Sequence, residues 1–404
     1  MLERVVIIGG GFAGIAAAKA LANTDFEVTI IDRKNHHLFQ PLLYQVASAA
    51  LSPADISVPI REVVSSAKNI KVFLDEVSFI DKLNNLVNCK SNKTYEFDHL
   101  IIATGARPFY FGNDDWKKLA PGLKTLEDAL SIRNKVLKSF EECELTGKEV
   151  LNFVIVGAGP TGVELAGAFA EIAYKILLND YKNFDASKTK VYLIEGGGEV
   201  LPSFSGKLSQ KAKSYLEELG VIVLTDRRVS KIERGVIHMG DEKILSENII
   251  WAAGNRASPL IDILEVKQDR MGRAIVESDL SLKNYPNIYI LGDSAHFIGA
   301  DNTPLPALAP VASQQGKHVA RQLKRRKSLP FKYLDKGNMA TIGNFKAVMN
   351  FRGMKVSGPI AWLAWSFIHI LFLIDFRNRI MVFTQWAFIF FFKKKGVRII
   401  TDRE

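Results

Sequence analysis

The sequence contains very little cysteine. Its 404 residues include two, Cys89 and Cys143, which are far apart and match no metal-binding or C-x-x-C spacing. This pattern argues against a redox-active dithiol, a disulfide framework and a cysteine-based metal site. We interpret both residues as structural thiols and expect no bound metal.

We expect no signal peptide, since the chain begins with a strand-like run and a glycine turn. The formal net charge is +10, and residues 321–404 carry 17 Lys and Arg against 4 Asp and Glu. That region therefore has 17 − 4 = +13, which leaves 10 − 13 = −3 for the rest. No zinc spacing or recognition-helix motif accompanies the basic region, so we expect no nucleic-acid partner.

Glycine, in contrast, is concentrated in two matching stretches. They cover residues 9–14 and 157–162, and each reads G-x-G-x-x-G between a β-branched apolar run and a helix-like run. The first glycine permits a tight turn, the second lets a pyrophosphate approach the backbone, and the third lets the helix pack on the strand. Phosphates then face free N–H groups at the positive end of the helix.

A second strand that ends in an acid follows each glycine stretch. Residues 28–31 lead to Asp32, and residues 191–194 lead to Glu195. A carboxylate at this place accepts hydrogen bonds from a ribose diol, and it disfavours the 2′-phosphate of NADPH. The sequence therefore predicts two dinucleotide-binding sites in an α/β fold. The alternative is a pair of unrelated glycine turns.

Three more strands end in small residues. One is followed by Ala103-Thr104-Gly105, one by Ala252-Ala253-Gly254 and one by Gly292-Asp293. In a flavin-binding fold the aspartate can hydrogen-bond the ribityl chain, although an ordinary helix cap has the same appearance.

Four other segments have patterns that predict local structure. Residues 70–100 and 221–250 alternate apolar and polar side chains, which predicts a small antiparallel meander in each half. Residues 36–61 are rich in proline and glutamine, and we expect an irregular segment packed on the cofactor. Its His36 and His37 are candidate ligands or proton donors, but a structural role fits better without a Cys or carboxylate partner nearby. A helix is expected over residues 311–323.

The C-terminal region combines basic and aromatic residues. Two apolar runs, 360–374 and 380–392, are separated by an interruption at 375–379. Basic residues precede them at 324–327 (KRRK) and follow them at 393–395 (KKK). As helices the runs would each span about 20–22 Å, less than the roughly 30 Å of a bilayer core. We therefore expect helices that lie in the membrane interface or form a shallow hairpin on anionic lipid. An aromatic dimer surface is the alternative.

Together these features resemble the type II NADH:quinone oxidoreductases, flavoproteins with two dinucleotide-binding domains. The most specific match is HLFQPLLYQV at residues 37–46, with LSP at 51–53. The resemblance implies an enzyme that passes a hydride from NADH to FAD and then two electrons to a membrane quinone, without proton pumping. It implies an α/β fold with an FAD-binding domain in residues 1–112 and 271–323, an NADH-binding domain in 113–270 and a C-terminal amphipathic helical membrane-anchoring region in 324–404.

The motifs and the resemblance assign the site residues. Those expected at FAD are Gly9, Gly11, Phe12, Ala13, Gly14, Asp32, Ala103, Thr104, Gly105, Gly292 and Asp293. Those expected at NADH are Gly157, Gly159, Thr161, Gly162, Glu195 and Gly254. Glu164 and Gln314 are the implied catalytic residues, and the implied quinone contacts are Ala309, Pro310, Gln314 and Gln315. The family pattern A-Q-x-x-x-Q has proline here at its first glutamine.

Two other functions remain open at this point. The first is a flavoprotein reductase of a soluble electron carrier, which the membrane-like C-terminal region disfavours. The second is a non-catalytic, redox-responsive flavoprotein adaptor, which turnover with NADH and a quinone would distinguish. The resemblance implies a peripheral protein on the cytoplasmic face of the inner membrane, with NADH, a membrane quinone and anionic lipid as partners. A homodimer is left open.

Overall fold

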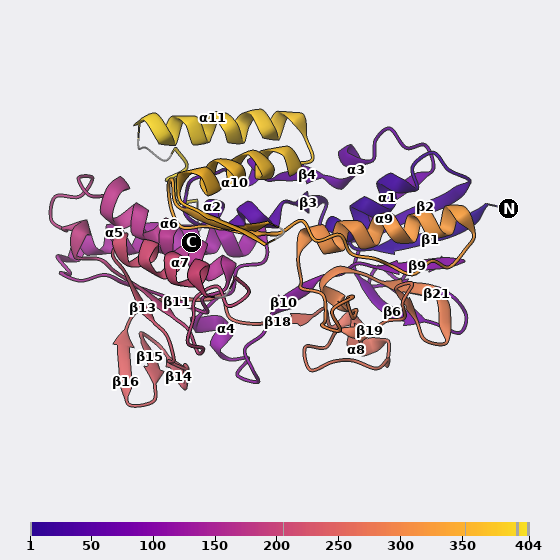
Figure 1. The fold of residues 1–404 in the computed structure, drawn as a ribbon, viewed down its shortest axis with the longest axis horizontal. Coiled ribbons are helices and arrows are strands. Elements are labelled where there is room, and N and C mark those ends of the chain that lie inside the picture. The colour runs from indigo at the N-terminus through magenta and orange to yellow at the C-terminus, as the bar shows by residue number, and fades with distance from the viewer. Residues whose placement is uncertain (1, 205, 352, 393–395, 402–404) are drawn as a thin grey trace. The chain divides into compact units, whose positions relative to one another are not determined.

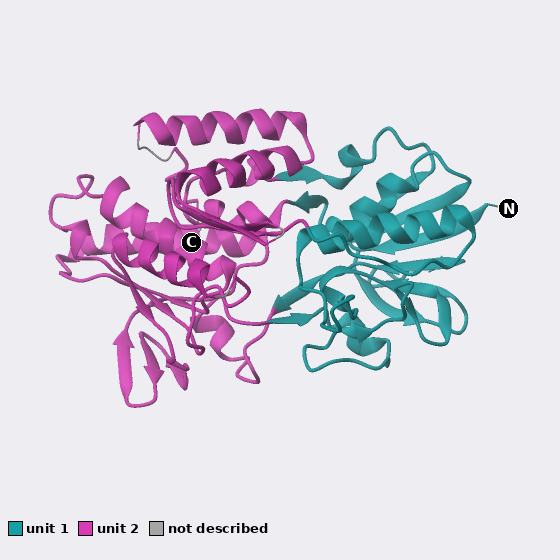
Figure 2. Ribbon diagram, viewed as in Figure 1, with its two compact units in different colours: residues 1–38, 57–107, 255–335 teal, residues 39–56, 108–254, 336–404 magenta. Residues whose placement is uncertain are grey.

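The computed structural model describes residues 2–204, 206–351, 353–392 and 396–401. The chain forms two compact units, each assembled from three separate segments (Figure 2). Unit 1 consists of residues 1–38, 57–107 and 255–335, and unit 2 of residues 39–56, 108–254 and 336–404. Each unit therefore contains one of the two glycine stretches. Unit 2 also takes in residues 39–56, which the expected domain boundaries assigned with the first stretch.

Unit 1 is built on a six-stranded sheet with the order β20-β21-β9-β1-β2-β5. Its strands are β1 (Glu3–Ile8), β2 (Phe26–Asp32), β5 (Ile70–Leu74), β9 (His99–Ile102), β20 (Ser281–Leu282) and β21 (Tyr285–Ile290). The central strand β1 runs parallel to β2 and β9, so Ile8 lies between Ile31 and Ile102. Because parallel strands end at the same edge, the glycine turn, the acid and the A-T-G motif are brought together there.

Two helices of unit 1, α1 (Phe12–Ala20) and α9 (Ala309–Arg325), pack side by side (Figure 1). Their backbones approach so closely that a Cβ built at Gly316 would lie 2.2 Å from the Ala13 carbonyl oxygen. The predicted helix over residues 311–323 is thus confirmed, with about one more turn in total. Pro310 lies in its first turn, where a missing N–H costs nothing.

The remaining elements of unit 1 are short. A three-stranded antiparallel meander packs on the sheet through apolar side chains that include Ile80, Val87 and Phe97. Its strands are β6 (Val77–Asp81), β7 (Leu86–Cys89) and β8 (Thr94–Glu96). The others are β3 (His36–Leu38), β4 (Ser57–Pro59), α3 (Ile60–Val63), β10 (Ala106–Pro108), β18 (Asn255–Ala257), α8 (Leu260–Ile263), β19 (Ala274–Ile275) and β22 (Ala295–His296).

Unit 2 repeats this plan with a four-stranded parallel sheet of order β13-β12-β11-β17. Its strands are β11 (Asn152–Val156), β12 (Lys190–Ile194), β13 (Val221–Leu224) and β17 (Asn248–Trp251). The helices are α4 (Trp116–Leu119), α5 (Leu126–Thr146), α6 (Pro160–Glu171) and α7 (Lys207–Glu218). A second antiparallel meander consists of β14 (Lys231–Glu233), β15 (Val236–Met239) and β16 (Glu242–Leu245). The two-fold internal pairing expected from the glycine stretches is present in the fold.

The predicted meanders were too long at their N-terminal ends. β5 and β13 begin the alternating segments, yet each is the third parallel strand of its main sheet. Both lie at a sheet edge, so they are partly exposed and alternate like meander strands. The separate strands expected before Ala103 and Ala252, β9 and β17, lie in the parallel sheets. Position in the sheet, and not periodicity, decides which strands are antiparallel.

The C-terminal segment contains a small sheet that the sequence did not predict. Its strands are β23 (Asn338–Thr341), β24 (Ala347–Phe351) and β25 (Met354–Ser357). Two helices follow, α10 (Pro359–Phe372) and α11 (Phe376–Phe392), and they pack with α2 (Leu43–Ala47) and the C-terminal sheet in unit 2 (Figure 1).

The break between the two apolar runs is shorter than predicted. α11 begins at Phe376, so Arg377 and Arg379 lie inside it. The Arg379 guanidinium donates to the Leu373 carbonyl oxygen at 2.9 Å, which caps the end of α10 and lets α11 begin early. In the described part of the chain, no helix is long and apolar enough to cross a membrane. The predicted lysine run at 393–395 lies outside the described residues.

The contact between α1 and α9 gives a prediction about stability. Gly316→Ala places a methyl group against the Ala13 carbonyl, so it should lower the free energy of unfolding by about 1–3 kcal/mol, the usual cost of overpacking. Chemical denaturation with FAD present measures this. Gly396→Ala, where a Cβ would meet none of the described residues within 4 Å, is the control and should leave stability unchanged. Equal stability of the two variants would contradict the close packing.

Candidate functional site

The two glycine turns have nearly the same geometry. Gly9 has φ +105° and Gly157 has φ +100°, in the region that favours glycine. A Cβ on Gly9 would lie 2.4 Å from the Ala103 carbonyl oxygen, and one on Gly157 would lie 2.7 Å from the backbone of Ala253. In both turns the first glycine is therefore required by the neighbouring strand end.

Two further glycines in each stretch have different roles: one lets the helix pack close to the turn, and the other leaves the turn open. A Cβ on Gly14 or Gly162 would lie within 1.9 Å of the carbonyl oxygen of the first glycine, so these residues allow the helix to start close to the turn. A Cβ on Gly11 or Gly159 would meet nothing within 4 Å among the described residues. The middle glycine is thus the open side of each turn, where a pyrophosphate can approach.

Each open glycine is also the residue that precedes a helix. Gly11 precedes α1 and Gly159 precedes α6, and neither helix has a side-chain cap or an acid in its first turn. The backbone N–H groups there, including those of Phe12, Ala13 and Thr161, form the positive end of the helix dipole. Both helix starts are suited to bind phosphate.

The acids hold the glycine turns in place. Asp32 accepts the backbone N–H groups of Gly10 and Lys34, at 2.5 and 2.7 Å. Glu195 accepts the corresponding N–H groups of Ala158 and Gly197, at 2.7 and 2.8 Å. Each carboxylate thus lies beside its turn, as the dinucleotide interpretation requires, and has lone pairs left for a ribose diol.

The strand-end motifs of unit 1 meet through Ser294. Its hydroxyl donates to the Gly105 carbonyl oxygen at 2.8 Å and lies 3.2 Å from the Thr104 hydroxyl. Gly292 donates its N–H to Gln315 at 2.7 Å. The residues expected at FAD therefore gather at one sheet edge, and the open glycine, the uncapped helix and the acid fit an adenine dinucleotide. Bound flavin would supply the acceptor for a hydride.

His37 supports the first turn. It is 2% exposed, and burial lowers its pKa to about 4, so the ring is neutral. Its Nδ1–H then donates to the Gly10 carbonyl oxygen at 2.9 Å, and its ring meets Phe12 edge-on. This contact supports the structural interpretation of the histidine.

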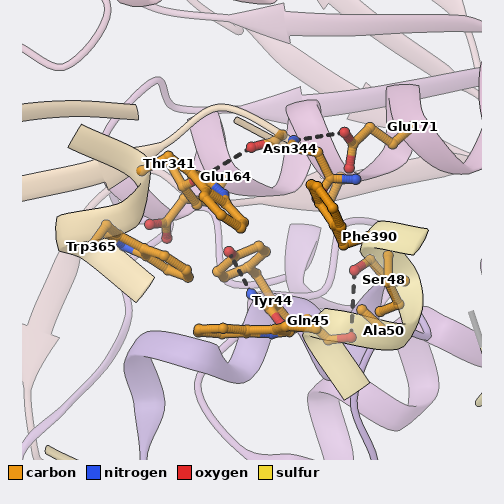
Figure 3. Close-up of a pocket in the computed structure, with 15 residues that line it drawn as sticks. Tyr44, Gln45, Ser48, Ala50, Glu164, Glu171, Thr341, Asn344, Trp365 and Phe390 are labelled. Carbon is orange, nitrogen blue, oxygen red and sulfur yellow. Dashed lines mark hydrogen bonds between the residues drawn. The ribbon is translucent and has the colours of Figure 1, made fainter. Parts of the chain in front are cut away.

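Unit 2 contains a separate cavity, shown in Figure 3, between α2, α6, the C-terminal sheet and helices α10 and α11. Tyr44, Glu164 and Trp365 enter it from three different elements. Its full lining is Tyr44, Gln45, Ser48, Ala50, Glu164, Ala168, Glu171, Thr341, Gly343, Asn344, Trp362, Trp365, Trp386, Ile389 and Phe390. Glu164 is the only residue of this lining that the sequence had assigned to the site.

Comparison with known proteins identifies the family. Residues 3–316 match the family model for pyridine nucleotide-disulphide oxidoreductases, and residues 336–395 match that for the NDH2 C-terminal domain. Two type II NADH:quinone oxidoreductases of Mycobacterium tuberculosis, Ndh and NdhA, are 39% and 37% identical to the chain. The alignments cover 100% and 99% of the chain and 91% and 90% of the relatives. The chain belongs to the type II NADH:quinone oxidoreductase family.

The fold agrees with this assignment. A solved structure of NDH2 from Plasmodium falciparum in complex with NADH superimposes with a TM-score of 0.90 over 100% of both chains, at 21% identity. The predicted fold, the enzyme class, FAD as cofactor and NADH and a quinone as substrates are therefore confirmed at the level of the family. The roles of individual residues stay predictions.

The residues implied for the quinone are already engaged in unit 1. Gln315 is 1% exposed and its amide oxygen accepts the Gly292 N–H, so it is a structural residue of the turn. Gln314 is half-buried and pairs with the backbone of Leu334, donating at 2.9 Å and accepting at 3.0 Å. Its amide nitrogen carries a second hydrogen, which can still meet a carbonyl.

Glu164 is electrostatically unusual. Burial raises its pKa to about 8, so the carboxyl is largely protonated at neutral pH. Burial, and the charge of Glu164, also raise the pKa of Tyr44 well above its usual value. Perturbed groups that share a cavity are typical of catalytic sites. Sequence reasoning missed Tyr44, although it lies in the family's most specific stretch, and missed Trp365 inside the aromatic region.

The raised pKa of Glu164 makes a prediction about pH. The folded state holds this proton up to about pH 8, whereas the unfolded carboxyl loses it near its ordinary pKa of 4.5. Stability of the native protein should therefore fall between about pH 5 and 8, by up to about 1.4 kcal/mol per pH unit. Glu164→Gln should remove this slope, measured by denaturant unfolding at several pH values, and the exposed Glu199→Gln should keep it. An unchanged slope in the Glu164 variant would show that the carboxyl is ionised in the folded state.

Proposed function

We propose that this chain binds FAD in unit 1 and NADH in unit 2, and that it reduces a membrane quinone while its C-terminal helices rest on lipid. The observation that carries the proposal is the duplicated geometry of glycine turn, uncapped helix and acid, one copy in each unit. The family membership supplies the reaction. The order of the two nucleotides follows the family resemblance.

For FAD, the proposed contacts are residues 9–14, Asp32, residues 103–105, Gly292 and Asp293. For NADH, they are residues 157–162, Glu195 and Gly254. Gly254 fits this proposal because it forms a turn directly after a strand, with φ +74° and the Phe111 ring close to it. Gln314 and Glu164 are proposed as polar contacts of the quinone, with Ala309 and Pro310 beside Gln314.

The proposed preference for NADH depends on Glu195. Its carboxylate would repel a 2′-phosphate, so kcat/KM for NADH should exceed that for NADPH by at least about tenfold. Glu195→Gln should narrow the ratio, because the amide is neutral. The test is oxidation of each nucleotide by FAD-loaded protein with a soluble quinone analogue. Comparable kcat/KM for both nucleotides in the native protein would overturn the assignment, and absence of turnover would favour the non-catalytic adaptor.

Attachment to a lipid surface is supported by the exposed apolar side chains of α10 and α11. They include Phe367, Phe376 and Phe383, which are 67%, 71% and 61% exposed. Aromatic side chains and a basic flank are typical of helices that lie in the membrane interface. The proposed place is the cytoplasmic face of the inner membrane, where NADH is available.

Replacing Phe367, Phe376 and Phe383 together by Gln should weaken binding to vesicles with phosphatidylglycerol by at least about tenfold, because burying one Phe is worth about 1.5–3 kcal/mol. Vesicle flotation measures it, and NADH oxidation by ferricyanide should persist. The control replaces Leu83 and Leu145, which are 81% and 87% exposed, by Gln. Unchanged vesicle binding together with a change from dimer to monomer in light scattering would assign the face to a homodimer instead.

A further inference from the structure

The cavity in unit 2 is small, and polar and apolar side chains share its lining. It encloses about 60 Å³, and its lining includes the polar side chains of Tyr44, Ser48, Glu164, Glu171 and Asn344. A single water needs about 10–15 Å³ and two to four polar partners. The cavity therefore suits a few waters better than a quinone ring.

A chain of hydrogen bonds fixes the direction of the Tyr44 hydroxyl. The Trp386 indole donates to the Gln45 amide oxygen at 2.7 Å, and the Gln45 amide nitrogen donates to the Tyr44 hydroxyl oxygen at 2.9 Å. An indole N–H can only donate, so it determines which end of the amide faces Tyr44. Tyr44 is the acceptor in this bond, and its own proton is left to point to another partner.

A second group also points to water in the cavity. Trp365 lines the cavity and is 2% exposed (Figure 3). Its indole nitrogen is buried and has no hydrogen-bond partner among the described residues. Trp365 is held by stacking on Trp386 and His369, with ring centroids 5.3 and 4.2 Å away. A buried N–H without a partner is costly, and a water oxygen in the cavity would satisfy it.

The reaction requires a proton from outside its two substrates. A quinone becomes a hydroquinone by gaining two electrons and two protons, and NADH is oxidised to NAD⁺ by giving up two electrons and one proton as a hydride. The balanced reaction is NADH + H⁺ + quinone → NAD⁺ + hydroquinone. One proton per turnover must therefore reach the quinone oxygen from water.

We propose that the cavity holds the water that resupplies this proton, through the Tyr44 hydroxyl, to Glu164. The inference rests on the proposed contact between Glu164 and the quinone. The Glu164 carboxyl gives its proton to the quinone oxygen, and its carboxylate takes one back from Tyr44. The Tyr44 hydroxyl simultaneously takes a proton from a cavity water, so it is never ionised, and that water regains its proton from the solvent, which supplies the H⁺ of the balanced reaction. Trp386 and Gln45 are positioning residues that orient this hydroxyl.

The other titratable groups around the cavity do not compete with this route. Glu171 accepts the Asn344 backbone N–H at 2.7 Å and lies 3.7 Å from the Lys175 ammonium. His369, on α10, stacks on Trp365, and burial lowers its pKa to about 4, so it is neutral. Glu164 and Tyr44 are left as the pair that exchanges protons.

The test uses Tyr44→Phe in the full-length, FAD-loaded protein, with stopped-flow measurement of each half-reaction. Reoxidation of the flavin by a quinone should slow about tenfold, the effect of one lost hydrogen bond in a relay, and show a larger solvent isotope effect in D₂O. KM for the quinone should not change. Flavin reduction by NADH, and reoxidation by ferricyanide, which accepts electrons without protons, should stay at the native rate. Tyr181→Phe, whose hydroxyl donates to the surface residue Glu141, is the matched control.

An infrared measurement gives a readout apart from activity. The infrared carbonyl band of the protonated Glu164 carboxyl is identified by its loss in Glu164→Gln. This band should titrate with pH in the native protein, and its frequency should shift in Tyr44→Phe. Trp386→Phe is a second variant, which keeps an aromatic ring beside Trp365 but frees the Gln45 amide, and it should slow quinone reduction in the same way but less.

The possible results of these experiments distinguish the proton relay from other roles of Tyr44 and from failure of the proposed function. A raised quinone KM with unchanged kcat in Tyr44→Phe would show that the cavity binds the quinone and not water. Equal losses with quinone and ferricyanide would show that Tyr44 only maintains the fold. Either result overturns the relay. Failure of the native protein to reduce its flavin with NADH would instead contradict the proposed function, which the ferricyanide assay detects separately.

Discussion

The structure depends on two glycines, one in each unit, at which the backbone of a neighbouring strand end occupies the space that a Cβ atom would need. Gly9 and Gly157 turn with positive φ directly against the end of the neighbouring strand, and an acid from the next strand accepts the N–H of the following residue. Any side chain at the first glycine would push this strand end away. The turn, the helix start and the acid are therefore one rigid group in each unit, and it leaves the middle glycine open. A dinucleotide needs this combination of free N–H groups, close access and a ribose acceptor.

In unit 1 the same requirement for small residues extends to α9. Gly316 lets this helix lie on α1, and Gln315, from the neighbouring position, accepts the Gly292 N–H. The glutamine expected to touch the quinone thus serves the turn that is expected to hold the flavin. Gln314 is held by the backbone of Leu334. Gln314 and Gln315 therefore both make hydrogen bonds that stabilise the fold, in addition to the role in quinone binding that is proposed for Gln314.

The C-terminal region has two different faces. Trp365 and Trp386 point into unit 2 and close the cavity over Glu164 and Tyr44, whereas Phe367 and Phe383 are exposed. An aromatic composition alone does not distinguish these faces, because the same residue types serve both. The segment that the sequence presents as an anchor therefore also forms part of a buried polar site. Its removal would open the cavity that makes Glu164 hold a proton near neutral pH.

The sequence by itself determined the two glycine turns, their acids and the helices that follow them. These features are local: glycine spacing, a strand before it and an acid after the next strand specify them within a few tens of residues, and the resemblance then supplies the reaction. Only the tertiary structure decided which strands join the parallel sheets, that residues 338–357 form a sheet, and that residues 39–56 join unit 2. It also brought Tyr44, Glu164 and Trp386 around one cavity. The hydrogen bond between Trp386 and Gln45 at this cavity joins residues 341 positions apart, and its energy depends on burial, which no local pattern encodes.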